Sequence, residues 1–229
     1  GVDYSVWDPS VDMLIPARYS AQDMDGKRVC KRELLERSGL TYDPDVPVIG
    51  MVSRLADQKG FDLLKENADA ILKMGIALVI LGTGQEEYHE FLSGLADEHP
   101  ERVAAHLTFN NELAHLIEAG SDMFLMPSRY EPCGLNQMYS LRYGTPPVVN
   151  FTGGRANTVT DATVMAITEK TANGFVFNNV NAEALLSTIK HALTIYKKPK
   201  QWQQVCETAM QQELGWDSSA KKYQTLYQK

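Results

Sequence analysis

Residues 48–60 read VIGMVSRLADQKG, an apolar run that passes directly into a polar turn carrying two cations. The run shows no alternation with polar residues, which is typical of a strand covered on both faces of a parallel sheet. Similar runs occupy residues 76–81, 123–126 and 147–149, and a weaker one spans residues 102–107. The sequence therefore predicts a parallel sheet that is buried on both sides.

Helical patterns separate these runs. Apolar residues recur every three or four positions over residues 61–72, 113–117 and 185–196, as in a helix that packs one face against a core. Strands that alternate with such helices through short connections predict an α/β fold with a doubly wound, Rossmann-like parallel sheet.

The 229 residues are interpreted as a single domain with three parts. Residues 1–47 form a linker-like segment with a first helix, residues 48–180 form the α/β core, and residues 181–229 are helical. The first helix is expected to start near Lys27, with Asp25 as its cap. A chain of this length buries roughly 70% of the surface of its unfolded form, so it can build a full core without disulfide bonds or bound metals.

Composition and charge exclude several classes of protein. The net charge is −7 and no block of Lys or Arg occurs, which disfavours nucleic acid and anionic membranes as partners. Neither an apolar run of roughly 20 residues nor a signal peptide is present. Cys30, Cys133 and Cys206 are widely spaced without a CxxC motif, which argues against disulfides and zinc and for a reducing compartment. We expect a cytoplasmic protein, or one of the plastid stroma in a plant.

Ligands of such sheets bind beyond the carboxyl ends of the strands. The first loop at this edge, residues 53–60, carries Arg54 and Lys59, a fork and a point charge that can converge on a diphosphate. An isolated pair of cations of this kind usually lies in a solvated loop. The position of Arg54 and Lys59 directly after the first buried strand favours binding instead. The second loop, Gly82-Thr83-Gly84, has Glu87 in place of the third glycine of a dinucleotide fingerprint and is given a supporting role.

The third and fourth loops carry a carboxylate and paired glycines. Glu131 stands beside the start of a predicted helix, where a carboxylate suits sugar hydroxyls and the N–H groups after Gly134 face the same space. Gly153 and Gly154 allow backbone amides to approach a phosphate closely. Taken alone, Glu131 would be interpreted as a helix-end charge, and the glycines could equally form a flexible turn.

Together these loops resemble the C-terminal domain of bacterial glycogen synthases and plant starch synthases. The similarity rests on four stretches, VSRL with DQKG in residues 52–60, DMFLMPSRYEPCGL in 122–135, YGT in 143–145 and TGG in 152–154. The start of the chain resembles that family's interdomain linker, and Trp216 with the residues after it resembles its closing helix.

The resemblance implies a GT-B glycosyltransferase of two Rossmann domains that transfers glucose from ADP-glucose to an α-1,4-glucan with retention. Arg54 and Lys59 would neutralise the leaving diphosphate and Glu131 would hold the glucosyl hydroxyls. Further substrate contacts would come from Phe109 against the adenine, Tyr139, and the backbone near Cys133, Gly134, Thr152 and Gly153. The resemblance implies neither a metal nor another cofactor.

Two positions differ from related sequences. Many related transferases have a second glutamate at the position of Tyr139, which agrees instead with the glycogen synthase subgroup. Asn157 stands where the family usually has an aspartate. The resemblance implies an N-terminal domain that meets the glucan acceptor, and we do not expect that domain among these residues. This chain is therefore expected to bind nucleotide but transfer little glucose.

Two alternatives remain open at this point, a non-catalytic module that binds sugar nucleotides and a UDP-glucose-dependent relative. A nicotinamide oxidoreductase shares the fold class, but Glu87 breaks the required GxGxxG pattern.

Overall fold

The computed structural model describes residues 1–131, 134–152 and 158–227. Six strands within these ranges form one parallel sheet of order β3-β2-β1-β4-β5-β6. The strands are β1 (Val48–Val52), β2 (Ala77–Leu81), β3 (Val103–His106), β4 (Met123–Met126), β5 (Pro147–Asn150) and β6 (Phe175–Phe177). This order is that of a doubly wound Rossmann-like sheet, so the predicted fold class is confirmed.

The helices are α1 (Asp25–Arg37), the 3₁₀ turn η1 (Asp57–Lys59), α2 (Phe61–Leu72), α3 (Glu86–Glu98), α4 (Asn111–Gly120), α5 (Asn136–Arg142), α6 (Val164–Thr168), α7 (Ala182–Tyr196), α8 (Pro199–Met210) and α9 (Trp216–Tyr227). The predicted cap of α1 is wrong. Met24 occupies the N-cap position without a side-chain hydrogen bond, and Asp25 is already helical. The carboxylate of Asp23 instead accepts a hydrogen bond from the N–H of Asp25 at 3.0 Å.

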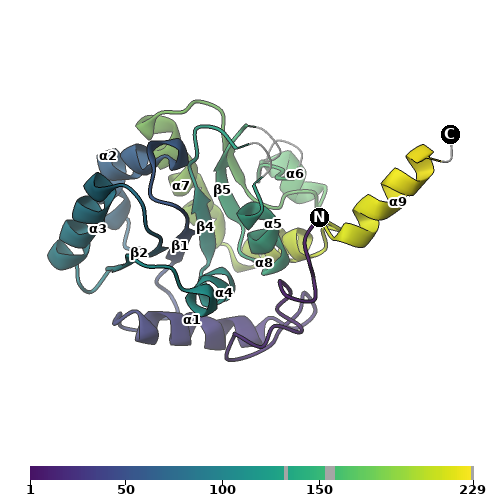
Figure 1. Cartoon of the computed structure of the whole chain (residues 1–229), viewed down its shortest axis with the longest axis horizontal. Helices are drawn as coiled ribbons and strands as arrows, with labels where there is room; N and C mark the ends of the chain where they lie inside the picture. Colours follow the sequence, from purple (N-terminus) through teal and green to yellow (C-terminus); the bar gives the residue numbers. More distant parts are fainter. Residues whose placement is uncertain (132–133, 153–157, 228–229) are drawn as a thin grey trace.

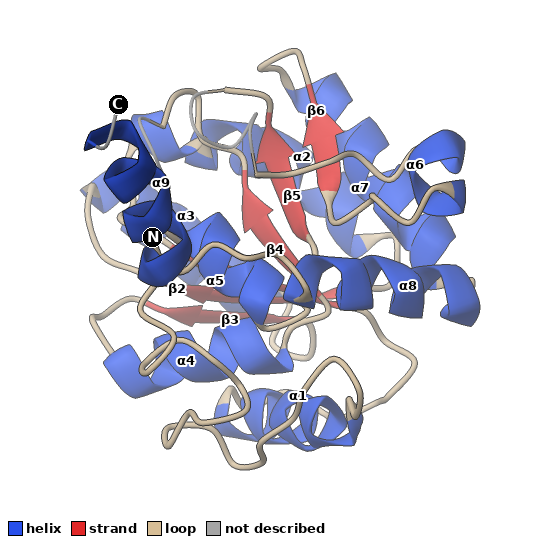
Figure 2. Ribbon diagram, turned by 90° about the vertical axis from the view of Figure 1, so that its right-hand side faces the viewer, coloured by secondary structure: helices blue, strands red, loops and turns tan. Residues whose placement is uncertain are grey.

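Helices cover both faces of the sheet (Figures 1 and 2). Successive residues of β1 point to opposite sides, as in any strand. Ile49 packs in one buried cluster with Phe61 of α2 and Leu185 of α7. Val48 packs in a second cluster with Leu116 of α4. Burial on both sides explains why the strands read as continuous apolar runs.

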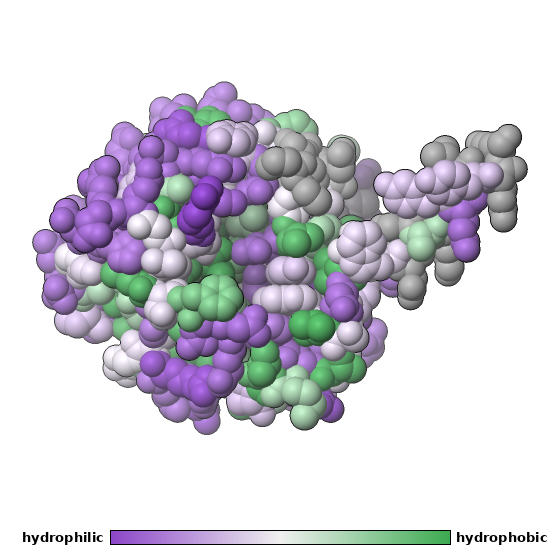
Figure 3. All heavy atoms as spheres, viewed as in Figure 1, coloured by the Kyte–Doolittle hydropathy of each residue, from purple (hydrophilic) through white to green (hydrophobic). Residues whose placement is uncertain are grey.

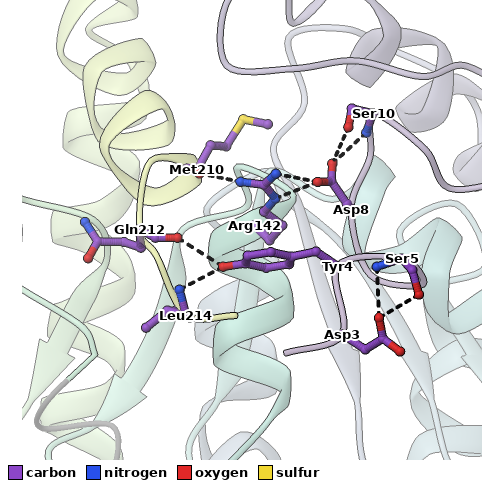
Figure 4. Close-up of polar contacts among 9 residues, drawn as sticks. All are labelled: Asp3, Tyr4, Ser5, Asp8, Ser10, Arg142, Met210, Gln212 and Leu214. Carbon is purple, nitrogen blue, oxygen red and sulfur yellow. Dashed lines mark hydrogen bonds and ion pairs between the residues drawn. The ribbon is translucent and has the colours of Figure 1, made fainter. Parts of the chain in front are cut away.

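The N-terminal segment is fastened to α5 through Arg142 (Figure 4). The Arg142 guanidinium forms an ion pair with Asp8 and donates a hydrogen bond to the carbonyl of Met210 at 3.2 Å. It also lies over the ring of Tyr4, with 4.4 Å from Cζ to the ring centroid. The Tyr4 hydroxyl donates to the carbonyl of Gln212 at 3.1 Å, so this segment joins α5 to the residues that precede α9.

A buried polar cluster fixes the same segment farther along. Asp12 Oδ2 lies 2.8 Å from His115 Nδ1 and accepts a hydrogen bond from the Tyr143 hydroxyl. Burial alone would raise the pKa of Asp12, but these hydrogen bonds outweigh it and leave the pKa below its ordinary value. The indole of Trp7 stacks on His115 with 3.7 Å between ring centroids. His115 therefore serves packing.

The last helix, α9, projects from the body of the molecule (Figures 1 and 3). The face seen in Figure 3 is mostly hydrophilic, with apolar residues gathered toward its middle. Across the described ranges, no helix combines the length and apolar character needed to cross a membrane.

Candidate functional site

A pocket of about 480 Å³ opens beyond the carboxyl ends of β1 and β4. This is the topological switch point, because β1 leads to β2 on one side while β4 leads to β5 on the other. Arg54 and Lys59 line it from the segment after β1, and Glu131 and Gly134 line it from the segment after β4. The structure thus brings together four residues that the sequence assigns to the site.

The central contact joins Lys59 and Glu131. Lys59 Nζ lies 2.6 Å from Glu131 Oε2, and their side chains are only 21% and 13% exposed. Truncating one partner of such a pair leaves the other charge partly buried and unpaired. This loss costs more stability than the loss of an exposed surface ion pair. The cation expected at the phosphates and the carboxylate expected at the sugar therefore hold each other in place.

Arg54 is the other cation of the pocket, and its side chain is exposed. Its Nη2 donates to Oε1 of Gln58 at 3.4 Å. Of the ion pairs found among the described residues, none involves Arg54. Because Glu131 offsets the charge of Lys59, the three side chains carry a net charge of +1, in a chain whose net charge is −7. The pocket therefore offers a localised attraction for an anion.

Two glycines shape the loop that carries Arg54. A Cβ on Gly82 would lie 1.9 Å from the carbonyl oxygen of Ser53, and one on Gly84 would lie 2.1 Å from that of Leu55. This close approach lets the parallel pairing continue past β1 and β2, since the N–H of Leu55 donates to the carbonyl of Thr83 at 3.0 Å. The supporting role of the Gly-Thr-Gly turn is to hold the backbone on either side of Arg54.

Gly134 permits the turn from the Glu131 loop into α5. Its φ of +68° lies in the left-handed region that favours glycine. A Cβ there would also lie 2.4 Å from Oε1 of Gln137 and 3.0 Å from Cγ of Glu131. At the start of α5, the amide of Asn136 donates to the carbonyl of Val52 at 2.8 Å and so fastens the helix to the end of β1.

Other predicted site residues lie elsewhere. Phe109 is 86% exposed in the loop between β3 and α4, and it does not line the pocket. Tyr139 is half-buried within α5, where its ring stacks on Trp7 with 4.0 Å between centroids. Burial raises the pKa of Tyr139. Thr152 is half-buried after β5.

The remaining predictions at the site concern Cys133, Gly153, Gly154 and Asn157, which fall outside the described residues. The other two thiols, Cys30 and Cys206, are free and buried. Burial raises the pKa of Cys206 to about 12, so this thiol stays protonated at neutral pH. Within the described ranges, no three His, Cys, Asp or Glu side chains gather closely enough to hold a metal ion.

Sequence reasoning missed two amide side chains that line the pocket, Gln58 and Asn136. Gln58 bridges the two halves of the site, because its Oε1 accepts from Arg54 while its Nε2 donates to the carbonyl of Tyr130 at 3.3 Å. Its position between Arg54 and Lys59 in the first loop is the signal that could have identified it.

A larger cavity of about 1270 Å³ lies at the opposite edge of the sheet, beside the segments that precede β1, β2 and β4. None of the predicted site residues lines it. At its wall, Lys31 is paired with Asp122 at 2.8 Å. Volume alone therefore does not identify the functional site.

Comparison with known proteins identifies the family to which the chain is similar. The model of the family described as glycosyl transferases group 1 matches residues 35–206. The glycogen synthase of Anaeromyxobacter dehalogenans is 45% identical over 227 residues, which is 99% of this chain and 47% of that protein. That of Syntrophotalea carbinolica is 44% identical over 229 residues, covering 100% of this chain and 47% of the relative. The chain thus spans about half the length of the curated relatives it matches.

Among solved structures, the catalytic domain of starch synthase IV from Arabidopsis thaliana, bound to ADP and acarbose, superposes with a TM-score of 0.92 at 32% identity. The match covers 100% of this chain and 47% of that one. The resemblance to glycogen and starch synthases expected from the four loops is confirmed. The chain belongs to the glycosyl transferases group 1 family.

Proposed function

We propose that this chain is the ADP-glucose-binding domain of a glycogen or starch synthase, a retaining glucosyltransferase that extends an α-1,4-glucan. The observation that carries the proposal is the convergence of Arg54, Lys59 and Glu131 in one pocket at the switch point of the sheet. The similar starch synthase IV structure, which is bound to ADP and acarbose, supports the choice of nucleotide and glucan.

The chemistry of glucosyl transfer suits this set of side chains. Negative charge grows on the departing diphosphate while positive charge grows at the anomeric carbon. Arg54 and Lys59 would stabilise the first, and Glu131 would orient the sugar that carries the second. Preorganised charges of this kind, fixed before the reaction, are typically the largest contribution to catalysis.

The other parts of the assignment extend this proposal. Phe109 would stack on the adenine, Tyr139 would support the site through α5, and the backbone at Cys133, Gly134, Thr152 and Gly153 would complete the cradle. The glucan acceptor would meet the half of the relatives' length that this chain does not span. The function of residues 1–229 would then be that of one donor-binding domain in a two-domain enzyme.

Calorimetric titration of the purified chain with ADP, ADP-glucose and UDP-glucose tests the proposal. We expect ADP and ADP-glucose to bind, with UDP-glucose clearly weaker. Glu131→Gln should lower the affinity for ADP-glucose relative to that for ADP, because the proposal places this carboxylate at the sugar and its partner Lys59 at the phosphates. Tighter binding of UDP-glucose would move the donor to uridine nucleotides, and no binding of any nucleotide by the folded chain would contradict the proposal.

A further inference from the structure

The loop that carries Glu131 rests directly on the segment that carries Lys59. The N–H of Arg129 donates to the carbonyl of Gln58 at 2.9 Å, and the Gln58 amide returns a hydrogen bond to the carbonyl of Tyr130. Gly60 approaches so closely that a Cβ there would lie 2.3 Å from the carbonyl oxygen of Pro127. The two halves of the pocket therefore meet backbone to backbone.

An ion pair outside the pocket joins the same two segments. Nη2 of Arg129 contacts Oδ2 of Asp62 in the first turn of α2. Arg129 stands two residues before Glu131, and Asp62 stands three residues after Lys59. Neither lines the pocket, so this pair brackets the Lys59–Glu131 contact without reaching a ligand in it.

A buried amide supports the loop from β5. Asn150 is 1% exposed, and its Nδ2 donates to the carbonyls of Ser128 at 3.1 Å and Arg129 at 3.3 Å. The backbone of this loop is thus held from the sheet side by Asn150, while its other side is held by the Arg129 side chain. Glu131 follows the last of these attachments by two residues.

We propose that Arg129 and Asp62 are positioning residues that hold the Glu131 carboxylate against Lys59 and thereby set the affinity for the sugar part of the donor. The second half of this statement rests on the proposed function. The side chains of the pair are 42% and 39% exposed, and pairs with such exposure contribute little to stability. Its effect is instead geometric, since small displacements of a functional group cost far more activity than stability.

The geometric half is tested without a ligand. The coupling between Lys59 and Glu131 is measured from the unfolding free energies of Lys59→Ala, Glu131→Ala and the double variant, first in the wild-type background and then with Arg129→Ala. We expect the coupling to fall to less than half in the Arg129→Ala background. An unchanged coupling would overturn the positioning role, whatever the chain binds.

The control is Lys65→Ala in the same helix α2. Lys65 pairs with Glu87 at 2.8 Å, and these side chains are at least as exposed as those of the Arg129–Asp62 pair. This variant removes a comparable surface ion pair that does not include a residue of the Glu131 loop, so the Lys59–Glu131 coupling should stay at its wild-type value. A loss of coupling here as well would show that any surface charge change has the same effect, which would overturn the proposal.

The binding half is tested by the ratio of ADP-glucose to ADP affinity. Arg129→Ala and Asp62→Asn should each lower this ratio by about tenfold, Arg129→Lys should restore part of it, and ADP alone should bind as in the wild type. A wild-type ratio in folded Arg129→Ala would overturn the role at the sugar. Failure of the wild-type chain to bind any nucleotide would refute the proposed function instead, while the coupling measurement would still decide the positioning role.

Discussion

The two edges of the sheet use their charged side chains in opposite ways. At the amino edge, beside the larger cavity, Lys31 is buried and its Nζ contacts Asp122 and the carbonyl of Pro44. At the carboxyl edge, Arg54 is exposed, and its side chain contacts only the Gln58 amide among the hydrogen bonds described. The buried lysine at the first edge is occupied in holding the fold, whereas Arg54 at the second edge forms no ion pair among the described residues. The convergence of Arg54, Lys59 and Glu131 at the switch point, rather than the size of the cavity, marks the candidate site.

Removing a cation from the amino edge should produce the largest loss of stability. Lys31→Ala leaves Asp122 partly buried without its partner, which should cost about 3–5 kcal/mol of unfolding free energy. Chemical denaturation measures this loss. If the comparison of the two edges is correct, the remaining folded protein binds ADP with wild-type affinity. Weaker ADP binding by folded Lys31→Ala would contradict the separation of the two roles.

The next prediction concerns the carboxyl edge, where the backbone of Gly82 lies close to that of Ser53. Gly82→Ala places a methyl group against the Ser53 carbonyl, so the loop must shift, at a cost of about 1–3 kcal/mol and with weakened ADP binding. Gly94→Ala in α3 is the matched control, because nothing lies within 4 Å of its Cβ position.

Gly94→Ala should gain about 0.5–1 kcal/mol through helix propensity and leave ADP binding unchanged. Thermal unfolding and calorimetry report both quantities. Equal behaviour of the two alanine variants would mean that Gly82 has no role in holding the loop.

A smaller effect is expected in the pH dependence of stability. Lys27 Nζ donates to the carbonyl of Ala119 at 2.9 Å and to that of Tyr143 at 3.2 Å, at the ends of α4 and α5. Burial lowers the pKa of Lys27 from 10.5 to about 8. Between pH 8 and 10.5 the unfolded chain therefore binds more protons at this lysine than the folded chain, and its contribution to stability rises with pH.

The measurement is the unfolding free energy of the wild type and of Lys27→Met at pH 7 and pH 9. The difference between the two proteins should change by about 1 kcal/mol in favour of the wild type at the higher pH. The measurement stops at pH 9 because burial raises the pKa of Cys206. At higher pH the thiol ionises more readily in the unfolded chain, which lowers the stability of the fold. A pH-independent difference would show that Lys27 keeps an ordinary pKa.

The strands and the location of the site could be predicted because both depend on local sequence. A parallel strand covered on both faces must be apolar throughout, so the run at residues 48–52 marks β1 to the residue. The ligand edge then follows from topology, which placed Arg54 and Lys59 correctly at the end of that strand. By contrast, β6 and α6 were not predicted, because three and five residues are too few to show a period.

Helix α3 was also missed, although its signal is present. Tyr88, Leu92 and Leu95 are buried at helical spacing, and attention to this period would have found the helix. The contacts within the site are of another kind. Lys59 meets Glu131 across 72 positions, and Gly82 meets Ser53 backbone to backbone. Such contacts depend on how strands are placed side by side, which no local pattern encodes.

The most direct test of the central claim is the titration of ADP into wild type, Arg54→Ala and Lys197→Ala. The Lys197 side chain is an exposed cation at the larger cavity, so this variant removes the same charge from the opposite edge. We predict that Arg54→Ala weakens ADP binding about 10- to 100-fold, as expected for a charged hydrogen bond, while Lys197→Ala binds as the wild type does. Equal losses in both variants, or loss only in Lys197→Ala, would contradict the placement of the nucleotide at the carboxyl edge.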